Sequence, residues 1–538
     1  MMRKLFLCAA TTFSLAAATV PAIAQANSGS VRTSQAPAVS PINWGTCASA
    51  GLRRRGAECA TLQVPLDYDK PAGDKVGLAI SRIKHKVPDA QYQGVMLVNP
   101  GGPGGSGLTL SVLGEFVPKD AGLAYDWIGF DPRGVGSSTP AVSCDPQYAG
   151  FNRPQYDPTT KAIEDAWRTK ASGYSKDCGD KNGPILDHLK TTDSAKDMNS
   201  IREALGAKQI NYYGFSYGTY LGQVFATMYP DKLRRVVFDG TVNTKDVWYD
   251  ANLNQDVAFD RNINIWFGWL AKHNDVYKLG TTAEAVNKLF YATQKKLYDV
   301  PAEGTQGKLG GSEWTDAFLY AGYYQSTWLG LAETFSAFIN DNDVDALQSA
   351  YLDVSGLGND NGYAVYTGVQ CTDVQWPQKW STWERDNTRI NKIAPFETWA
   401  NAWYNAPCLD WPAKAGQPVK VTGKNVKSLL MINETLDAAT PYPGSLEVRK
   451  LFPNASLIAV PGGTTHSNSL NGNVCVDDQI ADYLIDGTLP PRRHGNKTAD
   501  TECAALPQPD PSAQARQKSA APRVGDITRW DLQKISKP

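Results

Sequence analysis

Short apolar runs separated by glycine-rich loops dominate the first half of the chain. Residues 95–98, 127–130 and 236–238 are continuously apolar or nearly so, whereas residues 76–82 alternate between apolar and polar positions. Continuous runs of this length are typical of strands buried on both faces, and alternation indicates a strand with one more polar face. The pattern therefore predicts a sheet that is mostly parallel.

Helical spacing appears between these runs. Residues 192–205 place Met198, Ile201 and Leu205 on one face, and Gly206 follows as a helix stop. The resulting order of strand, loop, helix and strand is typical of an α/β fold with helices on both faces of its sheet. Strand character returns late in the chain, at residues 428–432 and 456–460.

Between residues 241 and 420 the pattern is different. This segment is rich in tryptophan and contains helical patterns at residues 283–297 and 326–338, and no buried strand stands out in it. We interpret it as a helical domain inserted into the α/β core. Most of its tryptophans are expected to form the inserted domain's own hydrophobic core.

The motif G-x-S-x-G occupies residues 214–218 and centres on Ser216. A β-prone run at 209–213 precedes it, and a helical pattern at 217–229 follows it. Strand, tight turn and helix are the context of the elbow that exposes a nucleophilic serine in α/β-hydrolases. The five letters alone would also fit a glycine- and serine-containing turn in another α/β protein, so the context carries the interpretation.

A histidine and an acid follow in the order that this fold uses, serine, acid and then histidine. Of the five histidines, His466 alone follows a predicted strand through a glycine-containing loop after the serine motif. Asp437 also follows a predicted strand, and Glu434 is a rival acid that lies closer to that strand. We expect Ser216 to attack a carbonyl, His466 to carry the proton and Asp437 to orient the imidazole.

The glycine-rich segment 99–107 follows the buried strand at 95–98. A phosphate-binding loop is the alternative, but the segment lacks G-K-S/T and the G-x-G-x-x-G pattern with a later acid. We interpret it as an oxyanion loop, with the backbone N–H groups of Gly102 and Tyr217 facing the developing negative charge. This chemistry needs neither a metal nor an organic cofactor.

Composition narrows the possible partners. The chain has 538 residues, 42% of them hydrophobic, which is more than one minimal domain requires. The 53 basic and 54 acidic residues balance, and no block of like charge stands out, so a nucleic-acid partner is not expected. The oligomeric state is not predicted.

The two ends of the chain differ in composition from the rest. Arg3 and Lys4 precede an apolar stretch at residues 5–20, and small residues at 21–24 offer a cleavage site. This pattern predicts a secretory signal peptide at residues 1–24 and a secreted or periplasmic protein without a membrane anchor, a retained anchor being the alternative. Residues 506–538 are rich in proline, alanine and glutamine and are expected to be loosely ordered.

The cysteines of the mature chain are even in number. Of nine cysteines, Cys8 lies in the predicted signal peptide, which leaves an even number in the mature chain. An even number in an exported chain predicts disulfides. Because short loops cost less to close, we expect neighbouring cysteines to pair: Cys47–Cys59, Cys144–Cys178, Cys371–Cys408 and Cys475–Cys503.

Taken together, the motifs resemble the secreted tripeptidyl aminopeptidase family, relatives of the proline iminopeptidases. The resemblance covers most of the mature chain and rests on these segments: E-C-A-T-L-Q-V-P-L-D-Y (58–68), N-P-G-G-P-G-G-S-G (99–107), G-F-D-P-R-G-V-G-S-S (129–138), G-F-S-Y-G (214–218), L-D-A-A-T-P (436–441) and G-G-T-T-H (462–466). The chain departs from the family at Ala438, where proline is common, and at Glu434, where glycine is common.

The resemblance implies an α/β-hydrolase core with a helical lid, and cleavage of short peptides, tripeptides among them, from free N-termini. The core would comprise residues 43–240 and 421–505, with the lid at 241–420. An exopeptidase must recognise the substrate's ammonium group, and Asp373 is our candidate for that role. A solvated or structurally paired acid is the alternative for Asp373.

Two other functions remain open from the sequence. A secreted carboxylesterase or lipase would use the same serine, aspartate and histidine, because this triad cleaves both esters and amides. A non-catalytic binding protein with a hydrolase-like fold is disfavoured, because all three residue types are present in the expected order.

Overall fold

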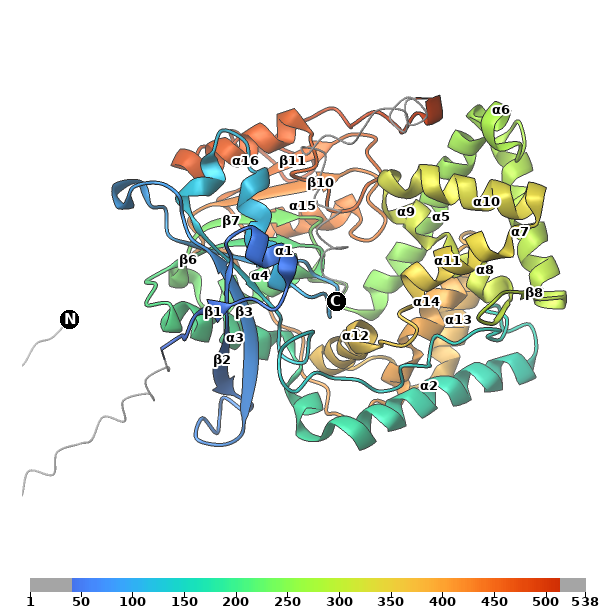
Figure 1. Cartoon of the computed structure of the whole chain (residues 1–538), viewed down its shortest axis with the longest axis horizontal. Helices are drawn as coiled ribbons and strands as arrows, with labels where there is room; N and C mark the ends of the chain where they lie inside the picture. The colour runs from blue at the N-terminus through green and yellow to red at the C-terminus, as the bar shows by residue number, and fades with distance from the viewer. Residues whose placement is uncertain (1–40, 513–538) are drawn as a thin grey trace, which may run out of the picture. The chain divides into compact units, whose positions relative to one another are not determined.

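The computed structural model describes residues 41–512 of the chain (Figure 1). The predicted signal peptide and residues 513–538 of the predicted tail lie outside the described residues. None of the described helices is both long and apolar enough to cross a bilayer.

A ten-stranded sheet forms the core, in the order β1-β2-β3-β5-β4-β6-β7-β10-β11-β12. The pairs from β1 to β5 are antiparallel, and the neighbours from β5 onward in that order are parallel. The predicted, mostly parallel sheet is therefore confirmed. The strands are β1 (Gly45–Thr46), β2 (Glu58–Pro65), β3 (Lys75–Ile83), β4 (Val95–Asn99), β5 (Asp126–Phe130), β6 (Ile210–Phe215), β7 (Leu233–Asp239), β10 (Leu429–Glu434), β11 (Ala455–Val460) and β12 (Thr501–Glu502).

Strand order reverses at β4. The chain passes from β4 to β5 on one side and later returns to β6 on the other side. In open α/β sheets, ligands bind beyond the carboxyl ends of the strands at such a reversal point. The glycine-rich loop follows β4 and Ser216 follows β6, so the topology brings these two segments to the same edge of the sheet.

Both faces of the sheet are buried, as the continuous apolar runs predict. On one face Leu97 and Tyr212 pack in a cluster with side chains of α3 (Thr191–Ala204) and α4 (Tyr217–Met228). On the other face Val98 packs in a cluster with side chains of α16 (Val474–Asp486). Alternate residues of β4 thus serve different cores, and every residue of that strand is buried.

A helical region lies between β7 and β10, on the right in Figure 1. Its aromatic core includes Trp266, Phe290 and Trp314, which are fully buried. The longer helices are α5 (Tyr249–Lys272), α7 (Ala283–Asp299), α10 (Trp328–Asp341), α11 (Val344–Ser355), α12 (Asn361–Asp373) and α13 (Trp380–Asn391), and the shorter ones are α6 (Asn274–Tyr277), α8 (Gly311–Ala317), α9 (Leu319–Tyr323) and α14 (Thr398–Asn405). The short strands β8 (Ala302–Glu303) and β9 (Lys308–Leu309) pair with each other.

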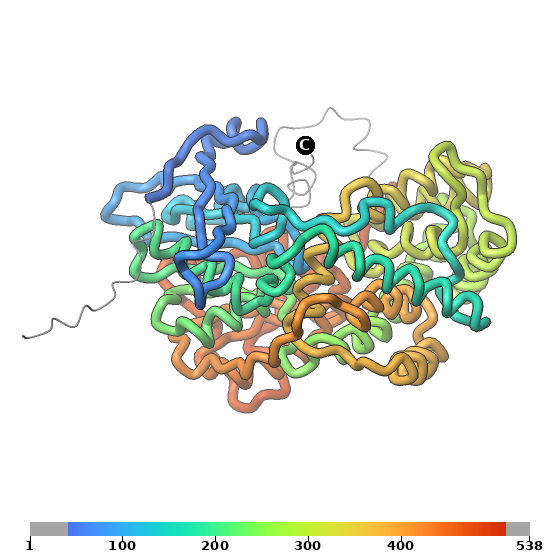
Figure 2. Tube along the Cα trace, turned by 90° about the horizontal axis from the view of Figure 1, so that it is seen from below, coloured from blue at the N-terminus to red at the C-terminus, as the bar shows by residue number. Residues whose placement is uncertain are grey.

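Helix α2 (Lys161–Asn182) precedes the nucleophile motif in the chain but packs against α14 of the helical region. Figure 2 shows it, in teal, running beside this region. Trp167 of α2 stacks on Trp403 of α14, with ring centroids 5.8 Å apart. Helix α2, which the sequence prediction assigned to the first part of the core, thus contacts the helical region, while its Tyr174 and Cys178 belong to the cluster that contains Leu97 of the sheet.

The four predicted disulfide pairs are confirmed, and all of them join neighbouring cysteines. Cys371–Cys408 connects α12 to the turn that follows α14 within the helical region. Each disulfide closes a loop in a single segment of the chain, as the argument from loop-closure cost predicts.

Candidate active site

Ser216 lies in the turn between β6 and α4, with φ 54° and ψ −128°. Positive φ is costly for a residue other than glycine, and such strain is often found at functional sites. The turn also demands glycine on both sides. A Cβ on Gly214 would lie 2.5 Å from the Gly218 carbonyl oxygen, and one on Gly218 would lie 2.7 Å from the Asn99 carbonyl oxygen.

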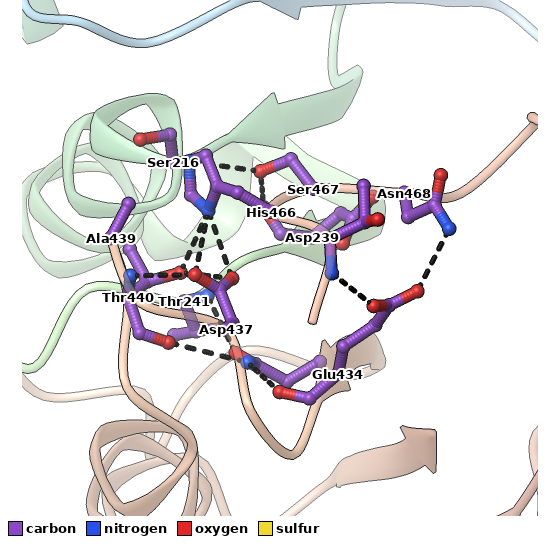
Figure 3. A network of polar contacts seen from close by, with 12 residues as sticks. Ser216, Asp239, Thr241, Glu434, Asp437, Ala439, Thr440, His466, Ser467 and Asn468 are labelled. Atoms are coloured by element: carbon purple, nitrogen blue, oxygen red, sulfur yellow. Dashed lines mark hydrogen bonds and ion pairs between the residues drawn. The ribbon is translucent and has the colours of Figure 1, made fainter. Parts of the chain in front are cut away.

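His466 and Asp437 form a buried pair at the carboxyl edge of the sheet (Figure 3). Imidazole Nδ1 lies 2.8 Å from one Asp437 oxygen and 3.0 Å from the other. Thr440 fixes this carboxylate further, because its N–H and its hydroxyl donate to the two oxygens at 2.9 and 2.7 Å. The rival acid Glu434 instead accepts hydrogen bonds from Thr465 N–H and the Asn468 amide.

The serine and histidine segments meet at one carbonyl. The N–H of Ser216 and the hydroxyl of Ser467 both donate to the Asp239 carbonyl oxygen, at 3.0 and 3.1 Å. The Ser467 hydroxyl also lies 3.4 Å from His466 Nε2. The Ser216 hydroxyl has no hydrogen-bond partner within residues 41–512, and both it and His466 line the same cavity.

The glycine-rich loop lies against the serine turn. A Cβ on Gly101 would be 2.5 Å from the Phe215 carbonyl oxygen and 2.9 Å from Tyr217 N. Asn99 holds this loop, since its side-chain oxygen accepts the Gly101 N–H at 2.9 Å. The N–H groups of Gly102 and Tyr217 donate to no other group in the described part of the chain, so they are available to an incoming oxygen.

Asp131 anchors the far end of the same loop. Its carboxylate accepts hydrogen bonds from the Ser106 hydroxyl at 2.6 Å, Leu108 N–H at 3.0 Å and Ser137 N–H at 2.8 Å. Asp131 is 1% exposed, and its burial raises its pKa. The backbone amides beside Ser216 are therefore held by contacts at both ends of the loop.

A cavity of about 1170 Å³ opens in front of Ser216. The core contributes the glycine-rich loop, Ser216 and His466 to its walls, and the helical region contributes many aromatic rings. These aromatic residues include Trp248, Tyr320, Tyr323, Tyr324, Tyr363, Tyr366, Trp403 and Tyr404. The volume exceeds that of sites for drug-sized ligands, which enclose roughly 300–1,000 Å³.

Asp373 does not line this cavity, so the prediction that it binds the substrate amine is not supported by its position. One of its carboxylate oxygens accepts the Thr191 N–H at 2.7 Å, and the other accepts the Thr191 hydroxyl at 2.6 Å and Trp248 Nε1–H at 3.2 Å. Asp373 thus caps the first turn of α3 from another part of the chain. Burial raises its pKa to about 6.

Two other acids of the helical region lie near each other, and one of them is at the cavity wall. Glu397 lines the cavity, and its Oε2 is buried without a hydrogen-bond partner among the described residues. Asp256, on the neighbouring helix α5, is 1% exposed and accepts a hydrogen bond from Asn401 at 2.8 Å. Burial raises the pKa of Asp256 to about 8. Burial also raises the pKa of Glu397 well above its usual range, and the nearby carboxylates of Asp256 and Asp316 add to the effect.

Arg153, one of the cations that line the cavity, is already paired with other acids. Arg153 bonds to Glu313 at 2.9 Å and to Asp316 at 2.7 Å. Neither Glu397 nor Asp256 forms an ion pair within the described part of the chain, and no cation is among the groups that shift the pKa of either carboxyl group. Sequence reasoning missed both residues, because no local motif marks them and the chain separates them widely.

Comparison with known proteins agrees with this architecture. The family described as "alpha/beta hydrolase fold" matches residues 94–467, from just before β4 to just after His466. The chain is 39% identical over 482 residues to a tripeptidyl aminopeptidase of Streptomyces coelicolor, covering 87% of each protein. It is 30% identical over 492 residues to the serine protease Hip1 of Mycobacterium tuberculosis (86% of this chain, 92% of that protein). It is 31% identical over 486 residues to the carboxylesterase B of that organism (86% and 91%).

Proposed function

The chain belongs to the α/β-hydrolase-fold family and, within it, to the tripeptidyl aminopeptidase family, and from this premise we propose that it is a secreted serine exopeptidase. The proposed substrates are short peptides with a free N-terminus, from which it releases tripeptides. That the chain is a serine hydrolase follows from its family. The peptide specificity rests on the cavity.

In the proposed mechanism Ser216 attacks the scissile carbonyl and forms an acyl-enzyme. His466 takes the serine proton and then donates it to the leaving amine, while Asp437 holds the imidazole and stabilises its positive charge. The N–H groups of Gly102 and Tyr217 bind the oxyanion, where preorganised donors stabilise the developing charge most effectively. A water molecule then repeats the sequence of steps and releases the acyl product.

One observation favours an aminopeptidase, namely the unpaired carboxyl oxygen of Glu397 in the cavity wall. A buried carboxyl group without a partner is costly, and an ammonium group of the substrate would satisfy it. Asp256 adds a second acid without an ion-pair partner nearby. In this proposal the substrate's N-terminus lies at Glu397 and its scissile bond lies at Ser216, with the aromatic walls between them.

A carboxylesterase is the second candidate, because a relative of that name is 31% identical to this chain. The serine, histidine and aspartate would serve an ester equally well. An ester substrate without an amine would leave Glu397 unpaired in the complex, which is the physical reason for ranking this function second.

A pair of matched substrates tests the proposal. A chromogenic tripeptide with a free amine should be cleaved at least about 100-fold more efficiently than its N-acetylated twin, because a lost buried ion pair costs about 3 kcal/mol. Glu397→Gln should reduce this preference by raising KM for the free amine. Glu447→Gln, a matched change at an exposed pair on the cavity rim, is the control and should leave the preference intact. Equal rates for the two substrates would favour the esterase.

Secretion is the remaining part of the proposal. Disulfides persist in oxidising compartments outside the cytoplasm, so the four cystines support export of the chain. N-terminal sequencing of the protein recovered from the culture medium or periplasm should begin just after Ala24 or Ala26. Recovery of the uncleaved chain from the membrane fraction would contradict this part of the proposal.

A further inference from the structure

Glu434 is the last residue of β10, and its side chain turns toward the loop that carries His466 (Figure 3). Its Oε2 accepts the backbone N–H of Thr465 at 2.5 Å. Its Oε1 accepts the side-chain amide of Asn468 at 2.8 Å. One carboxyl group thus contacts the chain on both sides of the histidine.

The fit between this carboxyl group and the loop is close. Glu434 is 6% exposed, and a Cβ on Gly463 would lie 2.5 Å from its Oε2 and 2.6 Å from its Cδ. Real Cβ atoms do not approach other heavy atoms so closely, so a side chain at position 463 would displace the Glu434 carboxyl group. The Leu436 N–H also donates to the Gly463 carbonyl at 2.9 Å, which joins the loop after β10 to the loop after β11.

The helical region holds the same loop from its other side. The His466 N–H donates to the Tyr323 carbonyl at 2.9 Å. The backbone segment that carries the imidazole is therefore held by hydrogen bonds from two sides. Glu434 bonds to it at Thr465 and Asn468, and the Tyr323 carbonyl bonds to it at His466. Without Glu434 the core side of this segment would lose both hydrogen bonds.

We propose that Glu434 is a positioning residue, which fixes the backbone on both sides of His466 and so keeps the imidazole between Asp437 and Ser216. The inference rests on the proposed roles of Ser216 and His466. Glu434 does not line the cavity, so it acts on the reaction through the histidine loop and not through contact with substrate.

The ionisable groups around Glu434 are acids and the histidine itself. Asp437 follows it on the same loop, Asp239 ends the neighbouring strand β7, and His466 lies on the loop that it holds. Burial, with smaller contributions from Asp437 and Asp239, raises the pKa of Glu434 to about 8. Burial therefore favours the neutral form of this side chain, and a neutral amide of the same shape should replace it well.

Two substitutions separate positioning from mere packing. In Glu434→Gln the amide oxygen can still accept the Thr465 N–H, and the NH₂ group can donate to Asn468 once that side-chain amide turns over. Glu434→Ala removes both contacts. We expect Glu434→Ala to lower kcat about 10- to 100-fold with KM changed less than about twofold, and Glu434→Gln to retain kcat within about threefold.

A second readout reports on the serine directly. Labelling of Ser216 by a fluorophosphonate depends on the oriented imidazole but not on substrate binding in the helical region. In Glu434→Ala the labelling rate should therefore fall in parallel with kcat. Asp477→Asn is the matched control. Asp477 is another buried acid that accepts backbone N–H groups, those of Leu470 and Gly472 at 2.7 and 3.0 Å, and its loss should lower stability without changing the labelling rate per folded molecule.

The outcomes are distinct. Labelling of Glu434→Ala at the wild-type rate, or a Glu434→Gln variant as slow as Glu434→Ala, would overturn the inference. If Glu434→Ala does not fold, Glu434→Asp is the deciding variant, because its shorter side chain keeps the acid but does not reach Thr465. An unchanged kcat in Glu434→Asp would also overturn the inference. Continued labelling of Ser216→Ala would instead refute the proposed function.

Discussion

Replacing Asp437 by asparagine changes little of the site's shape and most of its chemistry. The Asp437 carboxylate accepts hydrogen bonds from Thr440 N–H at 2.9 Å and the Thr440 hydroxyl at 2.7 Å, and it lies 2.8 Å from His466 Nδ1. Asparagine offers one oxygen and one NH₂ group in place of two oxygens. If its oxygen faces Thr440, its NH₂ group faces Nδ1, and the imidazole must then carry its proton on Nε2.

That tautomer cannot accept a proton from Ser216, so the loss should be large. The corresponding change in a serine protease of another fold lowers kcat about 10⁴-fold, which corresponds to about 5.4 kcal/mol of transition-state stabilisation. The same order is expected here, because Asp437 is 0% exposed and no water can replace its second oxygen. KM should change little, since Asp437 does not line the cavity.

The assay is steady-state cleavage of a free-amine tripeptide chromogenic substrate between pH 6 and pH 9, with thermal melting as the check on folding. Thr440→Val is the matched control, because it removes one hydrogen bond to the carboxylate and leaves the tautomer unchanged. It should cost about tenfold or less in kcat. An Asp437→Asn enzyme within about tenfold of wild type would refute the assignment of Asp437 as the acid that orients His466.

Three further predictions concern the glycine-rich loop, a disulfide and the buried acid Asp256. Gly101→Ala should lower kcat about 100-fold or more in steady-state assays, because the new methyl group would lie 2.5 Å from the Phe215 carbonyl oxygen and push the oxyanion loop away; unchanged kcat would contradict this. Replacing Cys371 and Cys408 by serine opens a loop with a sequence separation of 37 and should cost about 4 kcal/mol in urea unfolding, whereas a loss under about 1 kcal/mol would argue against the entropic account. Burial raises the pKa of Asp256 to about 8. Between the usual pKa of an aspartate and pH 8, the unfolded chain therefore binds fewer protons at this group than the native chain does. The free energy of unfolding should then fall as pH rises through this range, by up to about 1.4 kcal/mol per pH unit. Asp256→Asn should reduce that slope in urea titrations from pH 5 to pH 7.5, and identical slopes would refute the buried state of this carboxyl group.

The parts of the fold that the sequence predicts well are those with a local cause. Strands β4, β5, β7, β10 and β11 appear in the sequence as apolar runs, because a strand that is covered on both faces has no polar side. The turn at Ser216 is predicted by its flanking glycines, which the close backbone contacts at this turn require. The disulfides follow from loop length alone.

The cavity was harder to predict, because its walls come from segments that meet only in the tertiary fold. Asp373 stands beside Cys371 in a helix of the predicted lid, but the sequence does not indicate that its carboxylate turns inward to cap α3. Glu397 immediately precedes α14 and Asp256 lies on α5, and the packing of these two helices decides which side chains reach the cavity. From the sequence, a buried acid cannot be distinguished from an ordinary exposed polar residue until its neighbours in the tertiary fold are known.

Tertiary packing that the sequence does not show also decides the position of helix α2. Its sequence position before the serine motif favours the core, and Tyr174 and Cys178 do pack in the cluster of the sheet, whereas Trp167 stacks on Trp403 of the helical region. Chain order predicts spatial neighbours well for successive strands and helices of the sheet. It does not predict which layer an isolated amphipathic helix will cover.

The central claim is that Ser216, activated by His466, is the nucleophile. The most direct measurement is peptide mapping of the fluorophosphonate adduct, combined with its rate of formation in the wild type and in His466→Gln. The account predicts one adduct, on the peptide that contains Ser216, and a rate at least about 10³-fold slower in His466→Gln. An adduct on a different residue, or an unchanged rate without the imidazole, would contradict it.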